Sequence, residues 1–299
     1  MASRRQVLGL AAGAFAAGVA GLARAAGQAQ GVARGAGAGH AGDGAPAASP
    51  AAPLAIGETF TLVSRVLGET RRINVYSARA WDVKPDAPLP VLFMLDGGVA
   101  EDFVHTAGLL QVSVANLTMR SFMLVGIENT VRRRDMTAPT ESAEDKKIAP
   151  VVGGSAAFRR FIREELMPLV KARYNTTGES ALIGESLAGM FVLETFLHAP
   201  EMFDTFIAID PTLWWNNRHI LKTAGGLLGA RKRLDKTLFV ATSGEKGQPE
   251  LAKQLEDALS GVKVDGLRWQ MAPMLDETHM TIGHPGAMRA FRTVFKPAA

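Results

Sequence analysis

The chain has 299 residues, no cysteine, and 33 Lys and Arg residues against 29 Asp and Glu residues. The absence of cysteine excludes disulfides, thiolate metal sites and a cysteine nucleophile. Four of the bases and one of the acids lie before residue 54, which leaves 29 bases and 28 acids after it. That balance gives no basic surface of the kind that binds nucleic acid, so no nucleic-acid partner is expected.

The first 53 residues have the composition of a leader and a spacer. Arg4 and Arg5 precede an apolar stretch rich in Ala and Gly, which predicts a twin-arginine-type export signal over residues 1–25. A transmembrane anchor is the alternative, but the stretch falls short of the ~20 strongly apolar residues that a span requires. Residues 26–53 are almost wholly Ala, Gly, Pro, Ser and Gln, as in a disordered spacer. We expect a periplasmic or secreted protein that uses the twin-arginine export machinery, has no permanent membrane anchor, and folds over residues 54–299.

In the folded part, strand patterns alternate with helix patterns, and the internal strands are continuous apolar runs typical of a sheet covered on both faces. The expected elements, in chain order, are an antiparallel strand pair at 60–66 and 71–77, strands at 90–95 and 122–127, a helix at 158–173 kinked at Pro168, a strand at 181–183, a helix at 187–198, strands at 205–209 and 237–242, a helix at 249–259, a strand at 267–271 and a helix at 287–294. This order predicts an α/β fold, a mostly parallel sheet with helices on both faces.

Ser186 stands between the strand at 181–183 and the helix at 187–198, the position of the serine in a nucleophile elbow. Gly184 and Gly189 keep this tight turn sterically possible. The usual G-x-S-x-G pattern has glycine where this chain has Ala188, a difference of one methyl group. Because a serine alone is a weak nucleophile, a histidine base and a carboxylate that orients it are needed.

Ligands of such sheets bind beyond the carboxyl ends of the strands, where the partners of Ser186 should lie. His279 is the predicted base because it lies in the loop before the last helix, whereas His284 precedes a proline and begins that helix. Glu245 follows the strand at 237–242 and lies between Ser186 and His279, which is the order nucleophile, acid, histidine of the α/β-hydrolases. Glu245 is therefore the predicted acid, with a solvated loop glutamate as the alternative.

Main-chain N–H groups after a buried strand can stabilise a reacting oxygen. Gly97 and Gly98 follow the strand at 90–95, and their N–H groups are predicted to form an oxyanion hole with that of Leu187. A plain Asp-Gly turn is the alternative. No histidine or carboxylate cluster has the spacing of a metal site, so neither a metal nor another cofactor is expected.

Two further segments bear on the substrate. Trp214 and Trp215 follow a strand end, where they could form an aromatic wall or pack in the core. Arg132, Arg133 and Arg134 could attract an anionic substrate, and the alternative for Arg134 is that it braces the loop through its neighbour Asp135.

The motifs together resemble the putative-esterase family of α/β-hydrolases, which includes hydrolases of enterobactin-type siderophores. The matching segments are residues 95–98 (Leu-Asp-Gly-Gly), 132–140, 184–189 (Gly-Glu-Ser-Leu-Ala-Gly), 210–215 (Asp-Pro-Thr-Leu-Trp-Trp) and His279. The resemblance implies a serine carboxylesterase that acts through an acyl-enzyme on a small-molecule ester, of siderophore type or with a short chain. Family members commonly have serine where this chain has Asp210 and Thr212. An acyltransferase that uses the same triad and a catalytically silent binding relative are the alternatives.

Overall fold

The computed structural model describes residues 49–297. The predicted export signal and all but the end of the predicted spacer lie outside the described residues. None of the helices in the described part combines the length and the apolar character needed to cross a membrane.

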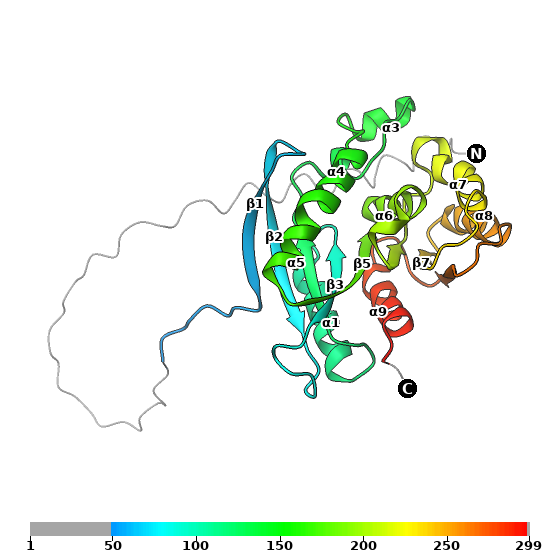
Figure 1. Ribbon diagram of the computed structural model, residues 1–299. Coiled ribbons are helices and arrows are strands. Elements are labelled where there is room, and N and C mark those ends of the chain that lie inside the picture. Colours follow the sequence, from blue (N-terminus) through cyan, green and yellow to red (C-terminus); the bar gives the residue numbers. More distant parts are fainter. Residues whose placement is uncertain (1–48, 298–299) are drawn as a thin grey trace, which may run out of the picture. The chain divides into compact units, whose positions relative to one another are not determined.

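Within residues 49–297 the strands form one eight-stranded sheet in the order β1-β2-β4-β3-β5-β6-β7-β8 (Figure 1). The strands are β1 Glu58–Ser64, β2 Glu69–Ala78, β3 Leu89–Met94, β4 Phe122–Ile127, β5 Thr176–Glu185, β6 Thr205–Ile209, β7 Thr237–Ser243 and β8 Arg268–Met274. β1 and β2 are antiparallel to their neighbours, and the strands from β4 to β8 run parallel. The mostly parallel sheet and the antiparallel pair that opens it are thus confirmed.

Helices cover both faces of the sheet, because side chains of each buried strand alternate between two hydrophobic cores. On β3, Phe93 packs into one core and Met94 into the other. The smaller core is closed by α1 Phe103–Ala115 and α9 Gly283–Val294 (Figure 1). The larger one is closed by α4 Ser155–Phe161, α5 Met167–Arg173, α6 Leu187–His198, α7 Trp215–Gly229 and α8 Gln248–Ser260.

Two local features differ from the expected elements. The kink expected at Pro168 is observed as a π-helical segment, η1 Ile162–Leu166, between α4 and α5. Proline cannot donate an intrahelical hydrogen bond and its ring crowds the preceding turn, which a wider π turn accommodates. The helices α1 and α7 were not expected. Shorter helices that also lie outside the expected set are α2 Arg132–Asp135, α3 Ala143–Ile148 and the 3-10 turn η2 Pro200–Met202.

The topology brings the chemically active segments to one edge of the sheet. The strands β3, β5, β6 and β7 are adjacent and parallel, so their carboxyl ends meet. Asp96 comes two residues after β3, Ser186 directly after β5 and Asp210 directly after β6. This edge is where sheets of this kind bind ligands.

Candidate active site

Ser186 lies in a strained turn between β5 and α6. Its φ is 60° and its ψ is −119°, a conformation that L-residues adopt only when the surrounding structure enforces it. The Ser186 N–H donates to the carbonyl of Ile209 at 2.9 Å, and its carbonyl accepts from the Met190 N–H at 3.0 Å. A Cβ on Gly184 would lie 2.7 Å from Ala188, so only glycine allows β5 and α6 to approach this closely. The turn has the geometry expected of a nucleophile elbow.

A histidine connects this serine to a buried carboxylate. His279 Nε2 lies 3.0 Å from Ser186 Oγ, and His279 Nδ1 lies 2.6 Å from Asp210 Oδ2. One ring nitrogen therefore faces the hydroxyl while the other faces an acid, which is the arrangement of a serine-histidine-acid triad. His284, the alternative base, lies in α9 with its Nδ1 2.9 Å from His105 Nε2.

Asp210 is held in the ionised form by its neighbours. The residue is 2% exposed, and burial alone would raise its pKa, but hydrogen bonds from His279 and from Ser243 lower the pKa overall. Ser243 donates its N–H at 2.8 Å and its hydroxyl at 2.9 Å. The hydrogen bond to Asp210 in turn raises the pKa of His279 above its ordinary value. A base strengthened in this way can accept a proton from a serine hydroxyl.

The prediction that Glu245 is the orienting acid is wrong. Glu245 follows β7 as expected, but it is exposed, and the carboxylate bonded to His279 is that of Asp210. Glu245 influences the histidine only through its charge, as the smallest of the effects that raise the pKa of His279. The physical reason is local, because Asp210 follows β6 directly and is buried beside His279, whereas Glu245 lies two residues beyond β7 in an exposed loop. Asp210 also lies between Ser186 and His279 in the sequence, so chain order could not distinguish the two acids.

The predicted oxyanion donors Gly97 and Gly98 are already bonded. The Gly97 N–H donates to the carbonyl of Ile127 at 3.0 Å, and the Gly98 N–H donates to Glu101 Oε2 at 2.7 Å. Neither N–H is free to stabilise a reacting oxygen in this conformation, so this part of the prediction does not hold. Leu187 begins α6, so its N–H has no partner inside the helix and suits the expected role.

The arginines of the segment after β4 are mostly bound to other groups. The Arg132 guanidinium donates two hydrogen bonds to the Asp96 carboxylate, at 2.6 and 2.8 Å. Its charge is therefore neutralised by Asp96. Arg133 is exposed and donates to the carbonyl of Ile148 at 2.5 Å. Arg134 bonds to two carboxylates, those of Glu69 and Asp135, which is the bracing role considered from the sequence. That Arg132 and Arg133 attract an anionic substrate stays a prediction. Their contacts with Asp96 and with the Ile148 carbonyl weaken that attraction.

The tandem tryptophans have different environments. Trp215 is 4% exposed and belongs to the larger core, so it packs rather than forms a wall. Trp214 is 44% exposed, with its ring centroid 5.8 Å from that of Trp215. Only Trp214 is therefore placed to meet a ligand from solvent.

Glu185, which precedes the serine, is a feature that sequence analysis missed. Its carboxyl lies in a small pocket that Asp102 and Gly283 also line. Burial and the negative charge of Asp102 raise its pKa to about 7, although His279 lowers it. A carboxyl group that titrates near neutral pH thus adjoins the serine and histidine. No group of three or more His, Asp or Glu side chains in residues 49–297 is placed to hold a metal ion.

Comparison with known proteins gives a consistent result. The model of the family described as "Putative esterase" matches residues 64–255. The chain is 26% identical to ferri-bacillibactin esterase BesA of Bacillus subtilis, over 77% of this chain and 86% of that protein. It is 29% identical to the siderophore triacetylfusarinine C esterase of Aspergillus fumigatus, over 74% of this chain and 79% of that one.

Solved structures share the fold. An IroE-like serine hydrolase from Shewanella oneidensis matches with a TM-score of 0.73 and 27% identity, covering 80% of each chain. The BES protein of Bacillus cereus matches with a TM-score of 0.71 and covers 85% of this chain and 100% of its own, and at 21% identity this likeness concerns the fold alone.

Proposed function

Because the chain belongs to the putative-esterase family of α/β-hydrolases, we propose that it is a serine carboxylesterase with Ser186, His279 and Asp210 as its catalytic triad. One observation carries the assignment. The two ring nitrogens of His279 lie 3.0 Å from the Ser186 hydroxyl and 2.6 Å from the Asp210 carboxylate. These are hydrogen-bonding distances that a general base requires.

The proposed reaction passes through an acyl-enzyme. His279 Nε2 accepts the proton of Ser186 Oγ as that oxygen attacks the ester carbonyl, and Asp210 stabilises the imidazolium that forms. The Leu187 N–H stabilises the carbonyl oxygen as it becomes negative. When the tetrahedral intermediate collapses, His279 returns the proton to the departing alcohol. Water then attacks the acyl-enzyme by the same route, releasing the acid and regenerating the Ser186 hydroxyl.

The substrate that we propose is an ester-linked siderophore. Relatives from a bacterium and a fungus that are similar over about three quarters of this chain are named as esterases of such compounds. A short-chain ester is the alternative substrate from the sequence. We further propose that the Arg4–Arg5 pair directs export of the enzyme from the cytoplasm. Outside the cytoplasm, ester-linked siderophores in the surroundings would be accessible to it.

The triad is tested by two pairs of variants assayed on p-nitrophenyl acetate. We expect Ser186→Ala and His279→Ala to lower kcat by on the order of 10⁴–10⁶, as triad residues do in other serine hydrolases. Asp210→Asn should lower kcat by about 10²–10⁴, because a misoriented imidazole still acts beside the Leu187 N–H, which stabilises the oxyanion. Glu245→Gln is the matched control and should retain nearly full activity. Circular dichroism should show all four variants folded.

Full activity in folded Ser186→Ala would overturn the nucleophile. A loss in Glu245→Gln combined with normal activity in Asp210→Asn would return the role of the acid to Glu245. The substrate class has its own test, in which the wild type is given a siderophore trilactone and short p-nitrophenyl esters. Cleavage of the short esters alone would reject the siderophore assignment and leave the triad standing.

A further inference from the structure

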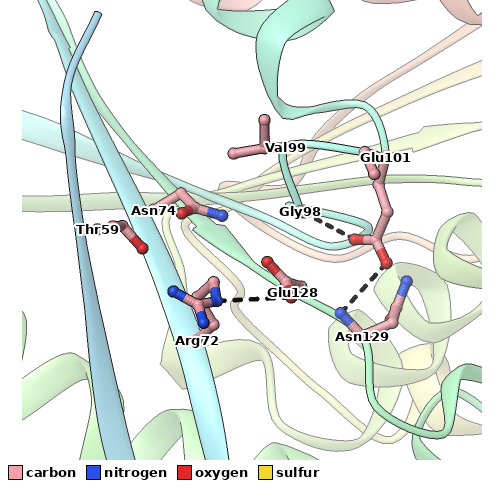
Figure 2. Close-up of a pocket in the computed structure, with 9 residues that line it drawn as sticks. Thr59, Arg72, Asn74, Gly98, Val99, Glu101, Glu128 and Asn129 are labelled. Atoms are coloured by element: carbon pink, nitrogen blue, oxygen red, sulfur yellow. Dashed lines mark hydrogen bonds and ion pairs between the residues drawn. The ribbon is translucent and has the colours of Figure 1, made fainter. Parts of the chain in front are cut away.

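Two sets of polar side chains lie where the chain leaves the carboxyl ends of the strands. The first lines a cavity of about 380 Å³ that includes the loop after β3 and the segment after β4 (Figure 2). There Glu101 accepts from the N–H groups of Gly98 and Asn129, at 2.7 and 3.3 Å. The second set, in residues 139–145, bonds instead to Asn216 near the start of α7. The second set therefore joins two segments that are far apart in the sequence.

The start of α7 contains a left-handed turn. Asn216, Asn217 and Arg218 have φ values of 48°, 52° and 61° and ψ values of 53°, 39° and 38°. In this conformation the side chain of an L-residue crowds the following carbonyl, so it is normally adopted by single residues rather than by runs. A run of three persists because neighbouring groups hold it in place.

A buried carboxylate provides such a hold. Asp145 lies in α3 and is 3% exposed, and its Oδ2 accepts the Asn216 N–H at 2.8 Å. The Thr140 hydroxyl lies 2.8 Å from the same oxygen. The side-chain amide of Asn216 donates to the Pro139 carbonyl at 3.3 Å. A hydrogen bond to a carboxylate is stronger than one to a neutral acceptor, so the bond from Asp145 dominates this clamp.

Trp214 lies between this clamp and the nucleophile elbow. Two residues before it, the Thr212 N–H donates to the Ser186 carbonyl at 3.1 Å. Two residues after it, Asn216 is bound by Asp145. Trp214 is 44% exposed, so packing alone does not fix its ring. If the Asp145 bond is lost, the left-handed turn can relax, and the exposed ring of Trp214 is free to follow.

We propose that Asp145 is a positioning residue, which sets the place of the Trp214 ring through its bond to Asn216 and thereby favours esters that carry an aryl group. The proposal rests on the esterase function proposed above and assigns to Trp214 the contact with that aryl group. Without the clamp the ring occupies several positions, so an aryl ester binds less tightly.

The test compares substrates that differ in one ring. Methyl acetate has none, methyl benzoate has one on the acyl side and phenyl acetate has one on the alcohol side, and a pH-stat measures the acid released from each. The variants are Trp214→Ala, Asp145→Ala, the two combined, and Asp145→Asn. Glu194→Gln is the control, because Glu194 is also a buried carboxylate, 8% exposed, and it accepts from the Ser155 hydroxyl at 2.8 Å outside the clamp.

We expect Trp214→Ala to lower kcat/KM for one of the two aryl esters by about threefold to tenfold relative to methyl acetate, mainly through KM, which is the size of an aromatic contact. Asp145→Ala should lower the same ratio by a similar factor. The combined variant should lose no more than Trp214→Ala, since Asp145 acts through Trp214. Asp145→Asn keeps an oxygen for the Asn216 N–H and should retain most of the ratio. Glu194→Gln should leave the ratio unchanged.

The wild-type ratio in folded Asp145→Ala would overturn the proposal, as would a loss in the combined variant equal to the product of the two single losses. If Asp145→Ala does not fold, Thr140→Val removes only the hydroxyl beside Asp145 Oδ2 and should lower the same ratio by about twofold. No change in Thr140→Val would then overturn the proposal. Failure of the wild type to cleave any of the three esters would instead contradict the esterase function.

Discussion

Replacing Glu185 with glutamine should stabilise the protein by an amount that grows with pH. The pKa of this carboxyl is raised to about 7 from an ordinary 4.5, because burial and Asp102 both disfavour its ionised form. Between these two values the unfolded chain loses the proton while the folded chain retains it. The free energy of unfolding therefore falls as pH rises from about 4.5 to about 7. Glutamine does not ionise and removes this dependence.

The expected magnitude follows from the size of the change in pKa. Each pKa unit corresponds to about 1.4 kcal/mol, so the ionised Glu185 costs about 3 kcal/mol of the free energy of unfolding above pH 7. At pH 5 the pH is only slightly above the ordinary pKa of 4.5, so the loss in the free energy of unfolding is below about 1 kcal/mol. Glu185→Gln should thus gain about 2–3 kcal/mol more at pH 8 than at pH 5.

Urea denaturation at the two pH values measures this difference, with Glu141→Gln as an exposed control that should show no such trend. The same variant should alter catalysis. Asp210 is the main cause of the raised pKa of His279, and Glu185 adds to it, so Glu185→Gln should lower the pKa of the histidine. The acidic limb of the kcat/KM profile should then move to lower pH. Equal stability gains at pH 5 and pH 8 would refute the reasoning, since the carboxyl would then titrate at its ordinary pKa.

Two further changes are expected to have clear outcomes. Asp135→Asn removes one partner of the buried ion pair with Arg71, whose side chain is 0% exposed, and should cost about 3–5 kcal/mol in urea denaturation. The exposed pair of Arg233 with Asp235 supplies the control, Asp235→Asn, and an equally small effect of both changes would contradict the account. Arg4→Lys combined with Arg5→Lys should retain the protein in the cytoplasm, as cell fractionation would show. Unchanged export would indicate the general secretory route.

The sequence was a good guide wherever hydrophobic patterning decides the structure. The apolar runs at 90–95 and 122–127 are β3 and β4, and the run before Ser186 is the end of β5. Patterning failed for α7, because residues 216–218 have left-handed dihedrals and the helix does not begin with a regular apolar face. It also failed for α1, where the exposed Val104 and Val112 lie among the buried positions and obscure their helical spacing.

The site was predictable to the extent that each role depends on local geometry. The elbow around Ser186 has a local signature, since small residues are needed where β5 and α6 approach. His279 was found because it lies in the loop before the last helix, where the base of such a triad belongs. The bonded state of Gly97 and Gly98 was not predictable, because whether their N–H groups are free depends on Ile127 and Glu101, and sequence spacing carries no information about such bonds.

The acid is the most instructive difference. The backbone neighbours of Asp210 are already part of the elbow. The Ile209 carbonyl accepts the Ser186 N–H at 2.9 Å, and the Thr212 N–H donates to the Ser186 carbonyl at 3.1 Å. One turn after β6 therefore fixes both the nucleophile and the carboxylate. Asp210 comes directly after β6 and its carboxylate lies 2.6 Å from His279 Nδ1, whereas Glu245 comes two residues after β7 and is exposed.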